Sequence, residues 1–581
     1  MASLLSPGVI SREIDLTTVT PAVASTEGGI AMHTQWGPAE KLVLVTDELD
    51  LVDVFGKPNN DNASDWFTAK NFLSYSGALY VSRALPDGAR NAVAGNPLQN
   101  GDAPSSASIK NLDHFESQTY TINGEWSAKY PGALGDSLKI SLADRSTYDT
   151  WLYKDLFSEK PDYDELHIVV VDEDGLISGE KGIVLEKYAF LSKFSDGKSE
   201  DGSSTYYEKV INDSSEYVWS LGAYAELTDW GKLADQVVEY GADGTVSNII
   251  GDAGALMLSH DRDGDGDPAN DLINSTHSFI SGNDGTPIQG DRVDALELFV
   301  DDELVDISFL LAGEADISVI NKIFAIASSR QDCLGVISPE KDDVVNAIDP
   351  MDNVKTFRET LNVGGLKDLK GSFMVMDDNW KYQFDKYNNL NRWVPCNGDT
   401  AGLMAETDIE RAAWFSPGGR SLKNVIKLAW KSKKAERDVL YPLGVNSVTT
   451  FPGEGAILYG DRTMLKRPSA FDRINVRRLF IILRKTISRT ARSFLFELNT
   501  EFTRERFKST VIPFLEEVQG RQGITDFLVV CDETNNTGQV IDQNRFIGDI
   551  YIKPARSINF IELNFVAVRT DVEFSEVVGS V

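Results

Sequence analysis

Short apolar runs alternate with helix-like repeats in the first part of this chain of 581 residues. Residues 42–45 and 78–82 are apolar runs of strand length, whereas residues 47–54 and 66–73 place apolar side chains at helical spacing. Acidic residues open the first of these helical stretches, which suits the positive N-terminal end of a helix. The pattern therefore predicts a compact α/β region over residues 23–88.

The same alternation returns in the second half of the chain. Residues 305–311 predict a strand, residues 315–328 a helix and residues 332–337 a second strand. A strand, a helix and a strand in this order form a βαβ unit with parallel strands and a right-handed crossover. We therefore expect residues 23–88 and 290–425 to be two halves of one α/β domain.

Residues 89–289 have a different composition, dominated by Gly, Asp, Ser and Asn. Residues 138–142 and 166–171 predict short strands, and an acidic turn follows at 172–175. This pattern predicts a β-rich insertion on the solvent side of the α/β domain.

Three helices are predicted in the region that follows. The first covers residues 422–440, the second opens at Asp472 as its N-cap, and the third opens near Thr500. Pro513 is expected to kink or end the third helix, because proline lacks the backbone N–H.

Both ends of the chain are predicted to be extended. Pro7 and Gly8 disfavour an early helix in residues 1–22. The C-terminal end alternates as strands over 524–531, 546–552 and 558–568. Free strand edges of this kind can pair with a neighbouring chain, or they can close in a self-contained sheet; the pattern alone leaves both alternatives open.

Charge is distributed unevenly along the chain. Residues 420–508 contain 20 Lys/Arg and 8 Asp/Glu, a local charge of +12, although the whole chain carries −33, so the remainder carries about −45. Such asymmetry is typical of a protein that is oriented against a partner. The large negative total disfavours nonspecific nucleic-acid binding by the whole molecule.

The helix that opens at Asp472 separates apolar and basic side chains onto different faces. The apolar face consists of Val476, Leu479, Phe480, Leu483 and Ile487, and the basic strip of Arg478, Lys485, Arg489 and Arg492. Aromatic residues that could stack on bases do not interleave with the basic strip, which disfavours a nucleic-acid site. We interpret the strip as a docking face for an anionic surface, against the alternative of an ordinary solvated helix face.

Motifs of known catalytic chemistry are absent from the sequence. It contains no phosphate-binding loop, no nucleophile elbow and no His-Glu-x-x-His pair. The cysteines, Cys333, Cys396 and Cys531, are far apart and include no C-x-x-C, so neither a disulfide framework nor a thiolate zinc site is supported. We expect a protein without enzymatic activity or cofactor.

One acidic run has the oxygen-rich spacing of a calcium loop. Asp261, Asp263, Asp265 and Asp267 alternate as in the first half of an EF-hand. Leu272 stands where a bidentate Glu is required, and Pro268 follows the run directly. We therefore favour a solvated acidic turn over a structural calcium site.

Several longer runs of residues indicate a protein family more specifically than hydrophobic periodicity does. They lie at residues 6–9 with Glu13, 35–38, 55–58, 130–136, 330–334, 381–387, 391–395, 470–480, 496–499, 530–537 and 555–560. Through these runs the chain resembles the tail sheath proteins of contractile-tailed, T-even-like bacteriophages. Only about 40 residues separate the run at 130–136 from the α/β region that ends near residue 88, so the outermost domain of the longest relatives is expected to be missing or reduced here.

The resemblance implies an α+β and α/β multidomain fold. Its expected parts are an N-terminal arm over 1–22, a middle α/β domain over 23–88 and 290–425, a β-rich outer insertion over 89–289, and an inner α+β domain with a C-terminal arm over 426–581.

The resemblance also implies a structural role in the virion. Subunits would polymerise as stacked hexameric rings around a tail tube, and contraction would drive the tube through the host envelope for genome delivery. The expected partners are other copies of the chain, the tail tube protein, and the baseplate and tail terminator proteins, with no direct nucleic-acid contact and no membrane insertion. Synthesis is expected in the host cytoplasm.

The resemblance assigns roles to two sets of residues. The inter-subunit arms would include Ser6, Pro7, Gly8, Val9, Glu13 and Asp15 at one end and Ile558, Phe560, Leu563, Phe565 and Val568 at the other. The basic strip of Arg478, Lys485, Arg489 and Arg492 would face the tube. Alternatives are the sheath of a related injection device, such as a tailocin or secretion apparatus, a calcium-dependent hydrolase, and a nucleic-acid-binding protein.

Overall fold

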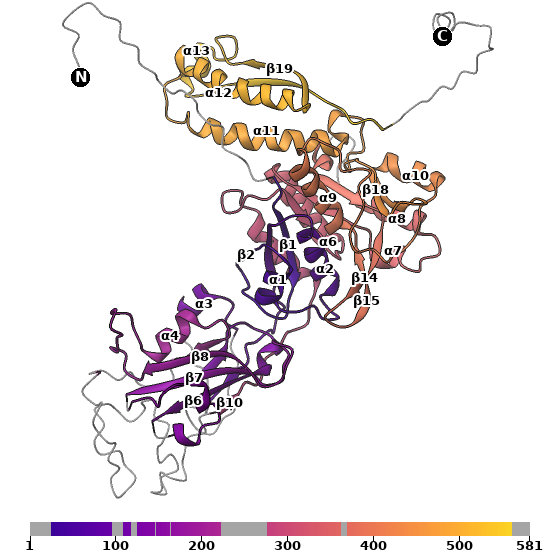
Figure 1. The fold of residues 1–581 in the computed structure, drawn as a ribbon. Coiled ribbons are helices and arrows are strands. Elements are labelled where there is room, and N and C mark those ends of the chain that lie inside the picture. Colours follow the sequence, from indigo (N-terminus) through magenta and orange to yellow (C-terminus); the bar gives the residue numbers. More distant parts are fainter. Residues whose placement is uncertain are drawn as a thin grey trace, which may run out of the picture. The chain divides into compact units, whose positions relative to one another are not determined.

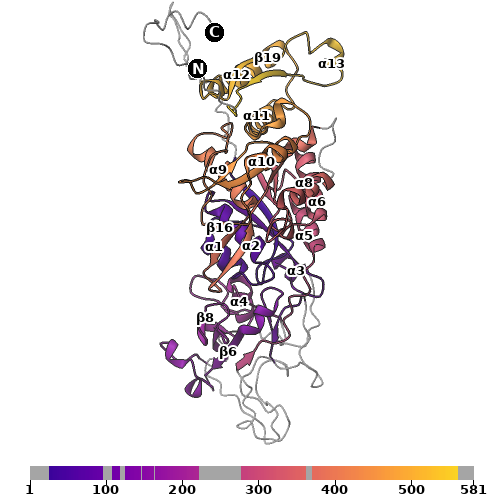
Figure 2. The ribbon, with the colours of Figure 1, turned by 90° about the vertical axis from the view of Figure 1, so that its right-hand side faces the viewer.

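The computed structural model forms two compact units, each described by itself (Figures 1 and 2). We call Ala24–Glu410 with Pro417–Asp472 the sheet unit, and the part containing Arg411–Ser416 and Arg473–Val581 the C-terminal unit. The structure describes residues 25–95, 108–117, 125–145, 147–162, 164–221, 230, 276–361 and 369–559.

An eight-stranded sheet forms the centre of the sheet unit, in the order β18-β17-β13-β12-β11-β1-β3-β2. The six inner strands are parallel, and an antiparallel strand closes each end. The strands are β1 (Gly28–His33), β2 (Leu42–Val45), β3 (Leu79–Ala84), β11 (Phe309–Leu311), β12 (Leu334–Ile337), β13 (Met374–Asp377), β17 (Val445–Thr450) and β18 (Ala456–Tyr459).

Helices form at the predicted positions 47–54, 66–73 and 315–328, and further helices that were not predicted also connect the strands. The Asp47 carboxylate caps α1 by accepting from the backbone N–H groups of Leu49 and Asp50, and Asp316 caps α6 through Val319. The βαβ unit of β11, α6 and β12 is confirmed, because its strands pair in parallel. The main helices are α1 (Glu48–Phe55), α2 (Ala63–Leu73), α5 (Gln289–Ala295), α6 (Ile317–Arg330), α8 (Pro350–Thr360), α9 (Asn397–Glu410) and α10 (Lys434–Leu440).

The helix predicted over residues 422–440 is wrong in its first half. Only α10 forms there, while β16 (Lys427–Leu428) pairs with β14 (Trp380–Asp385), which also pairs with β15 (Leu390–Pro395). The backbone N–H of Ile426 donates to the Tyr382 carbonyl at 2.9 Å. Pairing with a preformed hairpin therefore outweighs helical propensity in this segment.

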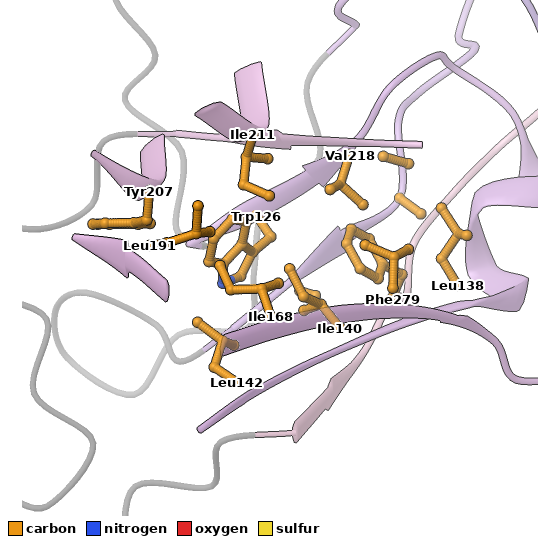
Figure 3. Packing of buried hydrophobic residues seen from close by; sticks show 14 of the residues in the cluster. Trp126, Leu138, Ile140, Leu142, Ile168, Leu191, Tyr207, Ile211, Val218 and Phe279 are labelled. Carbon is orange, nitrogen blue, oxygen red and sulfur yellow. The ribbon is translucent and has the colours of Figure 1, made fainter. Parts of the chain in front are cut away.

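The insertion is rich in strands, as predicted. One antiparallel sheet has the order β10-β6-β7-β8 and another the order β4-β5-β9. Figure 3 shows Trp126, Ile140, Ile168 and Ile211 converging from β5, β6, β7 and α4 into one buried cluster. The elements are β4 (Val93–Ala94), α3 (Leu112–Ser117), β5 (Trp126–Ala128), β6 (Leu138–Asp144), β7 (Glu165–Asp172), β8 (Ile183–Ser192), α4 (Tyr207–Ser214), β9 (Val218–Ser220) and β10 (Thr276–Ser278).

The C-terminal unit consists of two long helices and a two-stranded sheet. Its elements are α11 (Ile474–Arg492), α12 (Glu501–Gly520), β19 (Ile524–Val530), α13 (Gly538–Asp542) and β20 (Asp549–Pro554). Thr500 caps α12 as predicted, but the N-cap of α11 is Arg473, one residue after Asp472. The α12 helix continues through Pro513, since Leu515 and Val518 beyond it are buried and hold the last turns in place.

The contacts also group residues 417–472 with the sheet unit. The division of the chain into four parts at residues 22, 88, 289 and 425 stays a prediction. Among the described residues, no helix combines the length and apolar character that a membrane span requires.

Candidate assembly surface

The core of the C-terminal unit lies between its helices and one face of its sheet. Leu479 and Leu483 of α11 and Phe507 and Leu515 of α12 are buried in a common cluster. Four sheet residues pack against this cluster, namely Phe527, Val529, Ile550 and Ile552. The inner face of the sheet is therefore fully used by this unit's own core.

The outer face of the same sheet carries an exposed apolar pair. Leu528 lies directly opposite Tyr551, and their exposed fractions are 58% and 60%. Beside them the Lys553 ammonium donates to the Asp526 carboxylate at 2.7 Å. An apolar pair inside a polar margin is the usual arrangement of a surface that contacts another chain.

Hydrogen bonds beyond the β19–β20 pairing reach this sheet near the ends of its strands. The Gln519 side chain donates to the Thr525 carbonyl at 3.0 Å, and the Asn535 side chain donates to the Val530 carbonyl at 2.8 Å. Apart from the pairing with β19, no hydrogen bond within the described chain reaches the backbone of Tyr551 or its two neighbours. A two-stranded sheet is marginally stable by itself, so a further strand along the open edge of β20 would stabilise it.

The four cations of the predicted basic strip are not equally accessible. Arg478 and Lys485 are buried, with exposed fractions of 4% and 8%, whereas Arg489 is half-buried and Arg492 is exposed. Helical spacing alone placed the four cations on one accessible docking face, but α11 buries residues around more than one face. Long basic side chains can be covered in this way because their methylene stems are apolar.

Most of the predicted arm residues lie outside the described chain. These are Ser6, Pro7, Gly8, Val9, Glu13, Asp15, Phe560, Leu563, Phe565 and Val568. Ile558, which is described, is 82% exposed and follows β20 by only a few residues. An apolar side chain is therefore exposed to solvent just after β20.

The predicted calcium ligands Asp261, Asp263, Asp265 and Asp267 also lie outside the described residues. In the part of the chain that is described, no group of three or more His, Cys, Asp or Glu side chains is arranged to hold a metal ion.

The crevice where doubly wound sheets commonly bind ligands is filled by a side chain. The strands β1 and β11 pair only as far as Ile30 and Leu311, and the chain order reverses between them. Beyond that point the Arg292 guanidinium donates to the carbonyls of Ala31, at 3.0 Å, and Ala312. The side chain is 1% exposed, so the position at which a ligand would bind serves a structural purpose.

Three further carboxyl groups are buried near the same sheet. Asp377 accepts from the Ser338 hydroxyl at 2.9 Å, and Asp378 accepts from the Val448 backbone N–H at 2.8 Å. Burial raises the pKa of Asp377 well above its usual range, that of Asp378 to about 7 and that of Asp65 to about 6. Their hydrogen bonds are to structural groups of the fold, which favours a role in stability over catalysis.

Two family models match adjoining segments of the chain. The family model of the phage tail sheath protein central domain matches residues 313–464, and that of the phage tail sheath C-terminal domain matches residues 466–567. The tail sheath protein of Vibrio phage KVP40 is 32% identical to this chain, over 99% of this chain and 100% of the relative. This chain belongs to the phage tail sheath protein family. The tail sheath protein of Enterobacteria phage T4 is also 32% identical, over 99% of each chain.

Solved tail sheath structures share the fold at much lower identity. The sheath tail protein Lin1278 from Listeria innocua superposes with a TM-score of 0.53 at 12% identity, over 93% of this chain and 94% of that chain. The sheath tail protein of Desulfitobacterium hafniense gives 0.51 at 13% identity, over 94% of this chain and 100% of that chain. The expected mixed α/β fold is thus confirmed, and the protein is a component of a contractile phage tail or a related contractile device.

Two features of this tail sheath protein were not predicted from its sequence: the exposed Leu528–Tyr551 pair on the two-stranded sheet and the structural role of Arg292. The run 527–530 is apolar at four successive positions, which is typical of a strand covered on both faces, and this could have indicated Leu528. Arg292 carries no such signal, because its contacts come from strands more than 200 residues apart in sequence.

Proposed function

We propose that this tail sheath protein polymerises as stacked hexameric rings around a tail tube, and that contraction of the sheath drives the tube through the host envelope for genome delivery. The observation that carries the proposal is the two-stranded sheet with its exposed Leu528–Tyr551 pair and open β20 edge. Family membership supports the same role. Rigid-body movement at subunit interfaces would supply the contraction, so neither an active site nor a cofactor is needed.

The arms would connect neighbouring subunits. Strands from residues 6–15 and 558–568 of adjacent copies would complete the sheet along β20, by backbone pairing of the kind seen in β-augmentation. Each added strand would satisfy the backbone groups of the open edge and could cover Tyr551. The exposed sheet of one copy would thus bind the arms of its neighbours in the assembly.

The tube would be held by the basic residues of α11. Arg489 and Arg492 remain the members of the proposed strip with accessible surface, whereas burial of Arg478 and Lys485 favours a role for them inside the subunit. We also propose contacts with baseplate and tail terminator proteins, a location in the virion tail after synthesis in the host cytoplasm, and no enzymatic activity. The sheath of a related contractile injection device would use the same surfaces.

Electron microscopy of the purified chain tests the proposal. The full chain is expected to form hollow tubes in negative stain, whereas a variant lacking residues 1–20 is expected to stay folded and form none. Circular dichroism of the truncated chain is the control for folding. Tubes of normal length from the truncated chain would contradict the role of the N-terminal arm.

A further inference from the structure

The two ends of the eight-stranded sheet carry opposite charge. Residues 431–437 contain four Lys/Arg and one Glu, whereas residues 47–53 contain four Asp/Glu and no cation. The first segment leads into α10, which packs against β17, and the second contains most of α1, which directly follows β2. Figure 1 shows α10 and β2 on opposite sides of the sheet unit. We call these segments the basic end and the acidic end.

The lysines of the basic end form no ion pair with the residues that the structure describes. Lys431, Lys433 and Lys434 are exposed, and none of the described carboxylates lies within ion-pairing distance of them. Arg437 is half-buried, with its guanidinium 5.4 Å from the ring centre of Tyr459. In a chain of net charge −33, an exposed cluster of lysines without partners indicates a surface selected for an anionic counterpart.

Each charged end surrounds exposed apolar side chains. At the basic end Val439 and Tyr459 are 41% and 51% exposed, and at the acidic end Leu44 and Leu49 are 47% and 67% exposed. Apolar centres with a charged margin are the usual anatomy of protein–protein interfaces. The two ends therefore match in both charge and apolar character.

The acidic end also has an open strand edge. β2 pairs with β3 along one side, and no described strand lies along its other side. Two of the four acids of this end are held in fixed positions: Asp47 caps α1, and the Asp50 carboxylate accepts from the Thr46 backbone N–H at 3.1 Å. Their negative charges are thus presented as a preformed surface, with little side-chain ordering needed on binding.

We infer that the basic end of one copy docks on the acidic end of the next copy. The inference rests on the proposed function and adds a contact to it, because the two surfaces are different patches of one chain. Such a head-to-tail contact repeats from copy to copy and closes into a ring or continues as a helix. The tail tube and nucleic acid are the other anionic partners that the lysines could meet, and the experiment separates them.

Paired charge reversals test the contact in the full chain. One variant carries Lys431→Glu, Lys433→Glu and Lys434→Glu, so that both of its ends are acidic. A second carries Glu48→Lys, Asp50→Lys and Asp53→Lys, which leaves three cations against one acid over residues 47–53, so that both of its ends are basic. A matched control reverses three exposed lysines of the insertion, namely Lys187, Lys198 and Lys209. The readout is the concentration at which tubes form, measured by sedimentation and negative stain, with thermal melts as the folding control.

Each end variant alone is expected to need roughly tenfold more protein for assembly, since several exposed charge pairs are lost and replaced by repulsion. An equimolar mixture of the two variants is expected to assemble at close to the wild-type concentration, because unlike ends meet again when the two chains alternate. The control variant is expected to assemble normally.

Normal assembly of either end variant alone would overturn the contact. Failure of the mixture to restore assembly would also overturn it, because the anionic counterpart of the lysines would then be the tube or another molecule. These results presuppose tubes from the wild-type chain. A wild-type chain that never polymerises would instead contradict the proposed function itself, and this contact with it.

Discussion

Lys381 and Asp399 form an ion pair that has no exposure to solvent. The Lys381 ammonium lies 2.8 Å from the Asp399 carboxylate, and both side chains are 0% exposed. The Tyr75 hydroxyl donates to the same carboxylate at 2.9 Å, and the ammonium also donates to the Lys423 carbonyl at 2.9 Å. This network links Tyr75, which follows α2, to Asp399 of α9 and Lys381 of β14 inside the sheet unit.

Removing one member of this pair should cost much more than removing both. Lys381→Met leaves a buried carboxylate without its cation, and we expect the free energy of unfolding to fall by about 3–5 kcal/mol. The double variant Lys381→Met/Asp399→Leu should recover a large part of that loss. Denaturant titrations of the two variants check this, and equal losses would show that the pair is not coupled.

Asp378 should make stability depend on pH. Its pKa is about 7 in the fold, raised by burial from about 4 in the unfolded chain. The folded state therefore holds a proton that the unfolded state releases between about pH 4 and 7, so the stabilisation is complete below pH 4 and is lost as the pH rises through 7.

Asp378→Asn removes this titration while keeping an oxygen that can accept from the Val448 N–H. At pH 8 we expect the variant to be more stable than the wild type, by about 4 kcal/mol. At pH 4 the two should differ little. Urea melts at both pH values give the comparison, and a constant difference between them would show that Asp378 does not titrate in this range.

Arg292→Lys should loosen the middle of the large sheet. The planar guanidinium of Arg292 donates to the carbonyls of Ala31 and Ala312 at the same time, and a lysine ammonium cannot reproduce this geometry. We expect a loss of about 3 kcal/mol, because buried acceptors bound by a charged donor are left unsatisfied. Faster hydrogen exchange should concentrate in β1 and β11. A variant with wild-type exchange in these strands would show that the crevice is filled in another way.

Leu528→Ser with Tyr551→Ser should separate assembly from folding. Both side chains are more than half exposed, so the free energy of unfolding should change by less than about 1 kcal/mol. Tube formation should weaken strongly, since the exposed apolar pair would be lost from the interface. Ile550→Ser is the matched comparison: it affects the inner face of the same strand and should destabilise the subunit itself.

The accessible part of the basic strip can be tested in the same manner. Arg489→Glu with Arg492→Glu should weaken co-assembly with tail tubes and leave the melting temperature close to that of the wild type. Lys485→Glu should lower the melting temperature, because this side chain is only 8% exposed. Unchanged co-assembly of the double variant would contradict tube binding by α11 and would leave this helix a role within the subunit.

The elements that could be predicted from the sequence are those fixed by local signals. Asp47 and Thr500 cap helices where the sequence places them, because a side-chain oxygen beside the first free N–H groups acts locally. The parallel β11-α6-β12 unit follows from alternating periods over 30 residues.

The features that escaped prediction depend on distant contacts. Residues 426–429 pair with β14 instead of forming a helix, and Pro513 is tolerated inside α12 because the surrounding core holds both halves of that helix. The burial of Arg478 and Lys485 likewise depends on what packs around α11, which helical spacing does not contain. One acceptor of Arg292, the Ala31 carbonyl, is distant in sequence, so no local pattern marks this arginine.

The most direct test of the central claim is negative-stain microscopy of the purified full chain over a range of concentrations. The account predicts hollow tubes of uniform diameter above a threshold concentration, and no tubes from the chain that lacks residues 1–20. A full chain that stays monomeric at high concentration, while its circular dichroism shows a folded protein, would contradict the account.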